Sequence, residues 1–374
     1  MAVLADLLSD GASLKTGPFG TALAASEYSD TGVPVVSVGE VGDGYLALGE
    51  RTRRVSPTVT SRLSEYLLAD RDIVFARKGS VDRTALVRPH EAGYFLGSDG
   101  LRLRLGETAH ARFISLQLRS SAIKSWLLQH AGGSTLHSLN QETICRIPLW
   151  LPPLPTQRAI AEVLGALDDK IAANERVTSS ADALVRESFP SLTGDGEERV
   201  ISDLGDNPRD AARPPFEDGH YVGLEHVPRR SMWLTQTGNV DGLASGKFEF
   251  QADDVLFGKL RPYFHKVAVA DRRGICSTDI LVIRPKRTEL KGFVWAALAS
   301  DGVVRRASAM SEGTRMPRTR WSDLASCSVP WPGGRAAEAF SARVVVLRDR
   351  VAAATTESRH LATLRDTLLP HLMS

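Results

Sequence analysis

The sequence predicts an α+β protein with two similar mixed α/β domains, each followed by a long helix, and the two helices pairing as an antiparallel coiled coil with pseudo-twofold symmetry. Two long amphipathic segments each follow a stretch rich in short strand patterns. Short motifs recur in both stretches about 180 residues apart, which is typical of an internal duplication. The 374 residues are enough for two or more domains.

The first long segment is predicted to be a helix because its apolar residues recur at steps of four and three, on one stripe. We expect it to end at Pro190, since the residue before a proline is pushed out of the helical conformation. The second segment repeats the pattern and should stop before Pro370. Taken alone, the helices fit two ordinary core helices in separate domains equally well. The stripes predict a coiled-coil interface of Ile160, Leu164, Leu167, Ile171, Leu184, Phe340, Val344, Leu347, Val351, Leu361 and Leu364.

The helical segments and a stretch rich in proline and glycine divide the chain into five parts. Each globular part contains strand-like runs separated by glycine-rich turns, then one helix, near 113–129 in the first and 293–309 in the second. The predicted parts are a first domain 1–152, a central helix 153–190, a linker 191–198, a second domain 199–331 and a C-terminal helix 332–374.

The two globular parts also match each other locally. Residues 72–77 align with residues 254–259, and residues 98–104 align with residues 278–284. A single module, one globular part plus one helix, used twice in the chain explains both matches.

Composition excludes few classes of function. The net charge is +2, so only local clusters of charge can indicate a nucleic-acid partner. Cys145, Cys276 and Cys327 lack metal-ligand spacing and the histidines form no paired pattern, so we expect no metal site. The few cysteines fit a reducing compartment, and no signal peptide or membrane span is indicated, so we expect a cytoplasmic protein.

Polar loops occupy equivalent places in both globular parts. The densest, 258–266, directly follows a predicted strand, and its counterpart is 77–83. Arginine can grip guanine bidentately, and lysine contacts phosphates as a point charge. One such run is usually a solvated surface, but recurrence in both parts favours DNA contact. The predicted DNA-binding residues are Arg77, Lys78, Ser80, Arg83, Thr135, His137, Lys259, Arg261, Tyr263, Lys266, Arg315, Arg318 and Arg320.

Signals for catalysis are weak. The chain has no phosphate-binding P-loop, no Asn-Pro-Pro-aromatic motif for amino methylation and no nucleophile elbow, and we expect no catalytic residues. Asp279 with Glu289 and Lys291 spells a minimal metal-nuclease pattern of a kind that is common by chance. A self-contained nuclease or methyltransferase, and a coiled-coil scaffold that never binds nucleic acid, stay open as alternatives.

Several motifs together resemble one family over essentially the whole chain, the specificity subunit of Type I restriction–modification systems. Two departures stand out: Thr156 replaces the glutamate common before the Gln-Arg pair, and the second helix opens with Trp331-Pro-Gly-Gly-Arg335. The segments that carry the resemblance are 153–171, 254–266, 274–285, 313–318 and the ending 368–370.

The resemblance implies a non-catalytic subunit in which each globular part is a target recognition domain reading one half of a bipartite, asymmetric DNA site. The helices, rods of roughly 50 Å, would set the spacer. The chain would dock two methyltransferase subunits, which bind S-adenosylmethionine and methylate adenine. The complete enzyme would add restriction subunits that use ATP and Mg. No cofactor is expected in this chain itself.

Overall fold

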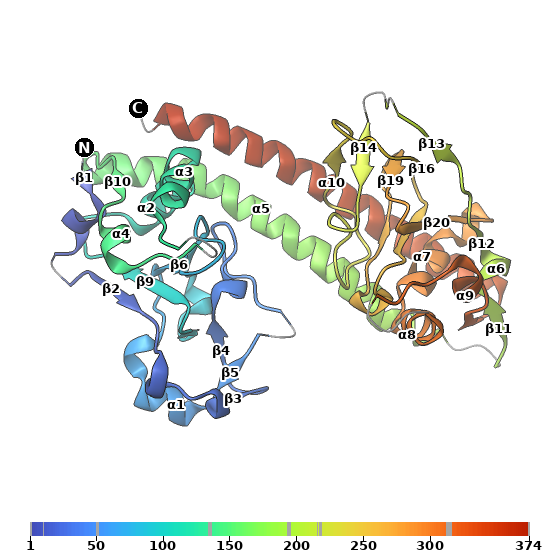
Figure 1. The fold of residues 1–374 in the computed structure, drawn as a ribbon, viewed down its shortest axis with the longest axis horizontal. Helices are drawn as coiled ribbons and strands as arrows, with labels where there is room; N and C mark the ends of the chain where they lie inside the picture. The colour runs from blue at the N-terminus through green and yellow to red at the C-terminus, as the bar shows by residue number, and fades with distance from the viewer. Residues whose placement is uncertain are drawn as a thin grey trace. The chain divides into compact units, whose positions relative to one another are not determined.

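The computed structural model describes residues 2–372 except 10, 50, 51, 134–136, 193–195, 215, 217, 218 and 312–315. Each half of the chain mixes strands with short helices and is followed by one long helix, so the predicted fold class is confirmed (Figure 1). The chain divides into unit 1, residues 1–169 with 361–374, and unit 2, residues 170–360. Each long helix therefore contributes one part to each unit.

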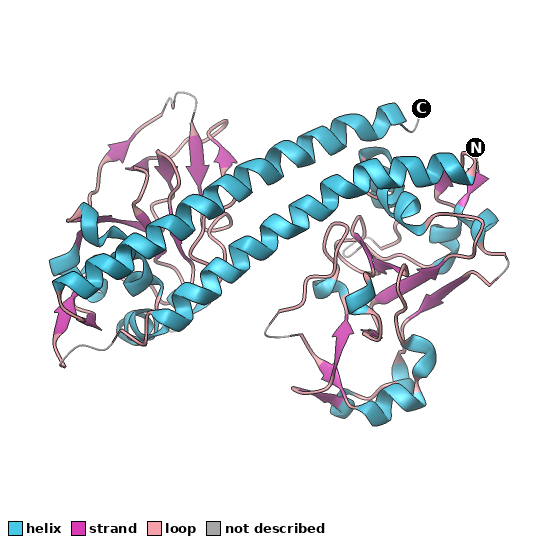
Figure 2. Cartoon of the chain, turned by 180° about the vertical axis from the view of Figure 1, so that it is seen from behind, coloured by secondary structure: helices cyan, strands magenta, loops and turns pink. Residues whose placement is uncertain are grey.

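Unit 1 is built on short strands and helices (Figure 2). Its strands are β1 (Ala2–Val3), β2 (Ser13–Thr16), β3 (Tyr28–Ser29), β4 (Val33–Val36), β5 (Arg54–Val55), β6 (Ile73–Ala76), β7 (Thr84–Leu86), β8 (Phe95–Leu96), β9 (Gly100–Arg104) and β10 (Pro148–Leu149). Its helices are α1 (Pro57–Arg62), α2 (Ala111–Leu118), α3 (Ser121–His130) and α4 (Gln141–Cys145).

Unit 2 follows the same plan. Its strands are β11 (Glu198–Val200), β12 (Gly205–Asp206), β13 (Ala211–Ala212), β14 (His220–Val222), β15 (Gly238–Asn239), β16 (Lys247–Phe250), β17 (Val255–Gly258), β18 (Val267–Val269), β19 (Gly274–Cys276), β20 (Ile280–Pro285) and β21 (Ser328–Pro330). Its helices are α6 (Ile201–Leu204), α7 (Lys291–Ala299), α8 (Asp301–Met310) and α9 (Trp321–Ala325), and the long helices are α5 (Leu154–Ser188) and α10 (Gly334–Leu372).

One four-stranded sheet has the same strand order in both units. The antiparallel order β2-β9-β6-β7 in unit 1 matches β12-β20-β17-β18 in unit 2. A second sheet in each unit contains one parallel pair, β4 with β8 and β14 with β19. A two-stranded ribbon, β1 with β10 or β11 with β21, completes each unit. The duplication inferred from the sequence is therefore present in the strand connections.

A buried carboxylate in front of the central strand marks the same point in both sheets. In unit 1, Asp72 accepts two hydrogen bonds of 2.7 Å from the guanidinium of Arg104. In unit 2, Asp254 accepts bonds of 2.9 and 2.8 Å from Arg284. This fork geometry ties the ends of two neighbouring strands together in each sheet.

The single helix predicted in each globular part is wrong, because each is two helices. The breaks fall between α2 and α3 and between α7 and α8. Ser120 and Ser300 cap the second helix of each pair, with hydroxyls accepting the N–H of Ile123 and Val303 at 3.3 Å. A serine that caps a new helix start competes with continuing the old one, and the apolar periodicity does not reveal this.

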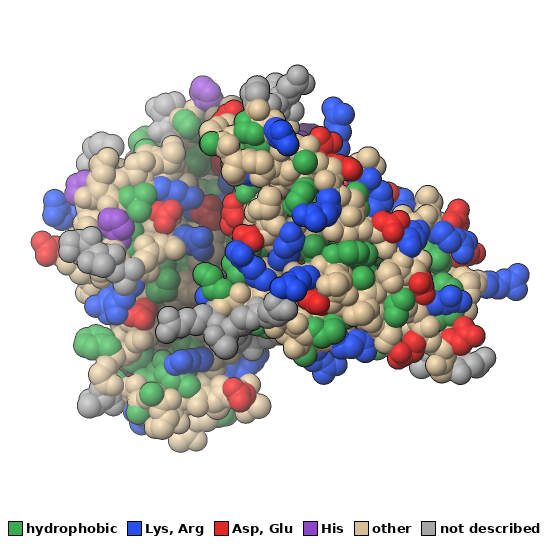
Figure 3. All heavy atoms as spheres, turned by 45° about the vertical axis from the view of Figure 1, so that its right-hand side comes forward, with side chains coloured by type: hydrophobic (Ala, Val, Ile, Leu, Met, Phe, Trp, Pro, Cys, Tyr) green, Lys and Arg blue, Asp and Glu red, His purple; other side chains and the backbone are tan. Residues whose placement is uncertain are grey.

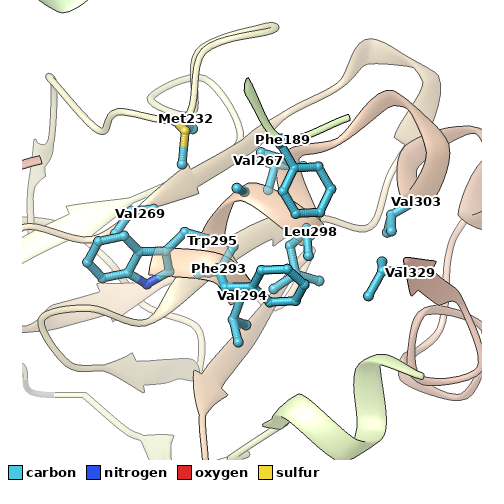
Figure 4. Close-up of a cluster of buried hydrophobic side chains, with 14 of the residues drawn as sticks. Phe189, Met232, Val267, Val269, Phe293, Val294, Trp295, Leu298, Val303 and Val329 are labelled. Carbon is cyan, nitrogen blue, oxygen red and sulfur yellow. The ribbon is translucent and has the colours of Figure 1, made fainter. Parts of the chain in front are cut away.

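The core of unit 2 surrounds helix α7 (Figure 4). Residues 292–299 of α7 are all buried, as expected for a helix apolar on every side. The Phe293 ring lies 5.5 Å from Trp331, edge to face, and the indole N–H of Trp295 donates to the Asp253 carbonyl at 2.9 Å.

Helices α5 and α10 meet in both units with reversed ends. In unit 1, Ile160 and Leu164 of α5 share a core with Leu369 near the end of α10. In unit 2, Phe189 just after α5 shares the core with Phe340 near the start of α10, their ring centroids 5.9 Å apart. The helices thus run antiparallel within each unit.

The contacts between the helices include buried polar groups as well as apolar ones. In unit 2 the Asn174 amide, 2% exposed, donates to Glu357 at 2.8 Å and to Ser358 at 3.2 Å. In unit 1 Arg365 donates to Asp168 at 3.0 Å. Such pairs fix which residues lie opposite each other, at some cost in stability.

Most of the predicted interface residues are covered, but two are not. Leu184 is 53% exposed and Leu364 is 46% exposed, so these two side chains are not buried in either unit. Ala181 and Val185 lie on the buried face of α5. Leu184 directly precedes Val185, so its side chain points to a different side of the helix. The buried residues are Ile160, Leu164, Phe340, Val344 and Val351, and the half-buried ones are Leu167, Ile171, Leu347 and Leu361.

The second long helix does not stop before Pro370, as the sequence predicted, but continues to Leu372. A proline in the last turn removes one hydrogen bond, and burial of Leu369 in the core of unit 1 holds this turn in place. Among the described residues, no helix is long and apolar enough to cross a membrane.

Candidate nucleic-acid interface

The polar loop after β6 in unit 1 is fixed by backbone hydrogen bonds to two other segments. The Arg77 N–H donates to the Asp99 carbonyl at 2.9 Å, and its carbonyl accepts the N–H of Leu139 at 2.8 Å. Two residues further on, the Gly79 N–H donates to the His137 carbonyl at 2.9 Å. The loop is therefore held between the start of β9 and the segment before α4.

The polar loop after β17 in unit 2 has the same frame. The Lys259 N–H donates to the Asp279 carbonyl at 2.8 Å, and its carbonyl accepts the N–H of Thr319 at 3.0 Å. The Arg261 N–H donates to the Pro317 carbonyl at 2.8 Å. These bonds join residues equivalent to those of unit 1, so the structure brings the predicted loop pairs together in both units.

The side chains of the unit 1 loop present charge at the surface. Lys78 lies 2.9 Å from the carboxylate of Asp99, with both side chains partly exposed. Arg77 donates weakly to the Ser98 carbonyl at 3.5 Å, and its Nε is buried without a hydrogen-bond partner among the described residues. Of the other predicted residues here, Ser80 is half-buried, Arg83 and His137 are exposed, and Thr135 lies outside the described residues.

A groove of about 870 Å³ lies beside the loop of unit 2. Its walls come from the segment before β13, strand β16, the start of β20 and the segment leading into α9. Cations and aromatic rings line it together, a combination suited to phosphates and base faces. They are Arg209, Lys259, Arg318, Arg320, Phe248 and Trp321.

Lys259 lines this groove. Its ammonium donates to the Thr278 carbonyl at 2.6 Å and lies 5.5 Å from the centre of the Phe248 ring. Burial lowers the pKa of Lys259, and the positive charge of Arg209 lowers it further. The cations of the groove therefore repel one another, which favours an anion between them.

Asp279 is the carboxylate that faces this positive charge. It lies 3.4 Å from Arg318, and the side chains of Arg318 and Asp279 are 60% and 37% exposed. The backbone of Arg318 forms a β-bridge with Leu260, which fixes where its side chain begins. Arg320 lies directly before α9, with its N–H donating to the Asp323 carboxylate at 2.9 Å.

The tip of the unit 2 loop carries an exposed aromatic ring. Tyr263 is 55% exposed and packs edge to face on Phe264 at 4.9 Å. Lys266 instead turns back to its own unit and donates to the Leu224 carbonyl, and burial lowers its pKa. Tyr263 is therefore accessible to a ligand, whereas the Lys266 ammonium is already engaged. Arg315 lies outside the described residues.

Several residues of this groove were not selected from sequence patterns. Arg209 lies 5.8 Å from the centre of the Phe248 ring, and Trp321 begins α9, so all three come from segments far apart in the chain. A basic residue next to Asn207-Pro208 is a turn signal that could have drawn attention to Arg209. Phe248 reads as an ordinary strand residue and carries no such signal.

The minimal nuclease pattern does not form a cluster. Asp279 pairs with Arg318 at the start of β20, whereas Glu289 pairs with Arg287 beyond its end, at 3.6 Å. Lys291 pairs with Asp253 at 2.7 Å. Throughout the part of the chain that the structure describes, no three His, Cys, Asp or Glu side chains are grouped to hold a metal ion.

The charge on the surface is mixed. On the face drawn in Figure 3, Lys and Arg side chains are interspersed with carboxylates. Attraction to DNA would therefore depend on local clusters, such as the groove, more than on the net charge of +2.

Comparison with known proteins agrees with this geometry. Residues 19–180 match the Type I restriction modification DNA specificity domain. The specificity subunit of the Type I restriction enzyme EcoDI from Escherichia coli is 33% identical over 97 residues, which are 26% of this chain and 21% of that protein. The match thus spans about a fifth of that relative.

The fold has a solved counterpart. The S subunit of a Type I restriction–modification system from M. genitalium superposes with a TM-score of 0.56 at 16% sequence identity, over 99% of this chain and 94% of that one. At this identity the likeness establishes the fold alone. The domain match confirms the resemblance inferred from the sequence for residues 19–180.

Proposed function

We propose that this chain recognises DNA sequence, with each unit reading one half of a bipartite, asymmetric target. One observation carries the proposal: the same backbone frame presents a polar loop in both units, with different side chains on it. A common frame gives both loops one approach to the duplex. Different side chains let them read different bases.

The proposed division of labour follows from exposure. Exposed cations such as Lys78, Arg83 and Arg318 suit phosphates, which fix register without carrying sequence information. The loop tip and the mixed wall of the unit 2 groove suit base edges and base faces.

The rest of the proposal concerns assembly. The antiparallel helices set the spacer between the half-sites and dock two methyltransferase subunits, which bring S-adenosylmethionine. Restriction subunits bring ATP and Mg in the full complex, and this chain carries out no reaction itself. The matched domain, at residues 19–180, supports this reading, because it includes most of α5.

The test is selection of randomised duplexes by the chain assembled with its methyltransferase subunit. The parent should enrich a split motif. Replacing Arg77 and Lys78 by Ala should relax or weaken one half, and replacing Lys259 and Arg318 should affect the other. Arg287→Ala is a matched control, since this exposed arginine pairs with Glu338 at 2.7 Å, away from the groove.

Two outcomes would contradict the proposal. Failure of the parent complex to enrich any sequence would favour a scaffold without a DNA role. Cleavage of DNA, or methyl transfer from labelled S-adenosylmethionine, by the purified chain alone would favour a self-contained enzyme.

A further inference from the structure

The polar loops after β6 and β17 both contain a residue with positive φ at the equivalent position, but the residue type differs. In unit 1 Gly79 has φ of 73°. In unit 2 the equivalent residue is Arg261, with φ of 51° and ψ of 62°. The left-handed region suits glycine, but in other residues it brings Cβ too close to the following carbonyl oxygen. Unit 2 therefore carries an arginine where glycine would be the unstrained residue.

The surroundings hold this conformation in place. The Arg261 N–H is bonded to Pro317 as the Gly79 N–H is to His137, and the Arg261 carbonyl accepts the N–H of Phe264 at 2.9 Å. On the far side of the short turn, the buried ring of His265 lies 2.8 Å from the Ala299 carbonyl. The start of the Arg261 side chain is therefore fixed relative to the groove.

The arginine side chain gains little within its own unit. Its guanidinium lies 5.8 Å from the Phe264 ring, which Arg229 already covers at 4.0 Å. Among the described residues, its Nε is buried with no hydrogen-bond partner. A strained backbone that supports an under-used side chain is typical of a functional position. A ligand with paired acceptors suits this guanidinium, because its Nε has no acceptor among the described residues.

We propose that Arg261 is a specificity-determining residue that donates two hydrogen bonds to O6 and N7 of a guanine in the half-site read by unit 2. The inference rests on the proposed function. Guanine fits because it offers two adjacent acceptors in the major groove, matching the guanidinium fork. Gly79 has no side chain, so in unit 1 the equivalent loop position makes no such contact with a base.

Two substitutions of Arg261 separate the effect of backbone strain from the effect of the guanine contact. Arg261→Gly removes the backbone strain and the guanine contact. Arg261→Lys keeps the strain and the positive charge but lacks the paired N–H donors of the guanidinium. Without DNA, Arg261→Gly should leave the melting temperature unchanged or raise it by up to about 4 °C, and Arg261→Lys should match the parent. In duplex selection with the methyltransferase subunit, both should lose roughly 5- to 150-fold discrimination for guanine at one position of one half-site.

The outcomes are separable from those of the proposed function. If the parent selects a motif and Arg261→Gly selects the same motif equally well, Arg261 does not read a base. A fall in melting temperature of more than about 4 °C for Arg261→Gly would show a structural role instead, and would also overturn the inference. If the parent itself selects no sequence, the proposed function fails first.

Discussion

Asp279→Asn offers a direct test of the groove in unit 2, because it removes a negative charge without changing shape. The carboxylate lies 3.4 Å from Arg318, and both side chains are well exposed. An exposed pair of this kind contributes about 0–1 kcal/mol to stability. The Asp279 backbone carbonyl, which holds Lys259, is untouched. The free energy of unfolding should therefore change by less than about 1 kcal/mol.

DNA binding should respond more strongly. A unit charge about 5 Å from a phosphate is worth roughly 0.8 kcal/mol at the permittivity of water, so removing the repulsion should tighten binding about fourfold at low salt. If the freed Arg318 neutralises one further phosphate, the slope of log K against log salt should steepen by about 0.9. The gain should fall as salt is raised, because the Debye length shortens.

The assay is fluorescence anisotropy with a nonspecific DNA duplex across a salt series. It uses the chain assembled with the proposed methyltransferase subunit. Asp99→Asn is the matched variant in unit 1, where the carboxylate lies 2.9 Å from Lys78. Both variants should tighten binding. Unchanged or weaker binding by Asp279→Asn, with its stability intact, would show that the groove does not face phosphates.

Three further predictions concern the fold that supports the loops. Phe340→Ala removes a buried ring packed on Phe189 and should cost about 3–5 kcal/mol, with melting as the measure; Phe19→Ala, 67% exposed, should change little. Asn174→Asp places a carboxylate against Glu357 and should lower the melting temperature more than Asn174→Ala does; equal effects would refute the role of that contact. Burial lowers the pKa of His265, as does Arg186, so folded protein binds fewer protons than unfolded protein below the ordinary histidine pKa. Stability should therefore fall as pH drops from 7 to 5, and His265→Asn should flatten this dependence in urea titrations.

Much of the fold follows from local sequence patterns. Apolar spacing predicted both long helices, and recurring strand motifs predicted the duplication that the two matching sheets display. The breaks at Ser120 and Ser300 were not predicted, because an apolar stripe can continue across a cap. The exposure of Leu184 depends on how the helices face each other, which periodicity alone does not set.

The candidate site was only partly predictable. The loops at Arg77 and Lys259 were predicted because polar runs follow matching strand patterns in both parts of the sequence. Arg209, Phe248 and Trp321 join the unit 2 groove only through tertiary folding. The strain at Arg261 is likewise a property of the backbone, which residue type alone does not reveal.

The central claim is that two equivalent globular domains each recognise one half of a DNA target. Exchange of one domain tests this claim most directly. Residues 199–331 would be replaced by the matching part of a Type I specificity subunit. Methylated adenines would then be mapped in DNA from cells that express each chain with the methyltransferase subunit proposed as its partner. One half of the methylated motif should change while the other half is retained. A change in both halves, or in neither, would contradict the account.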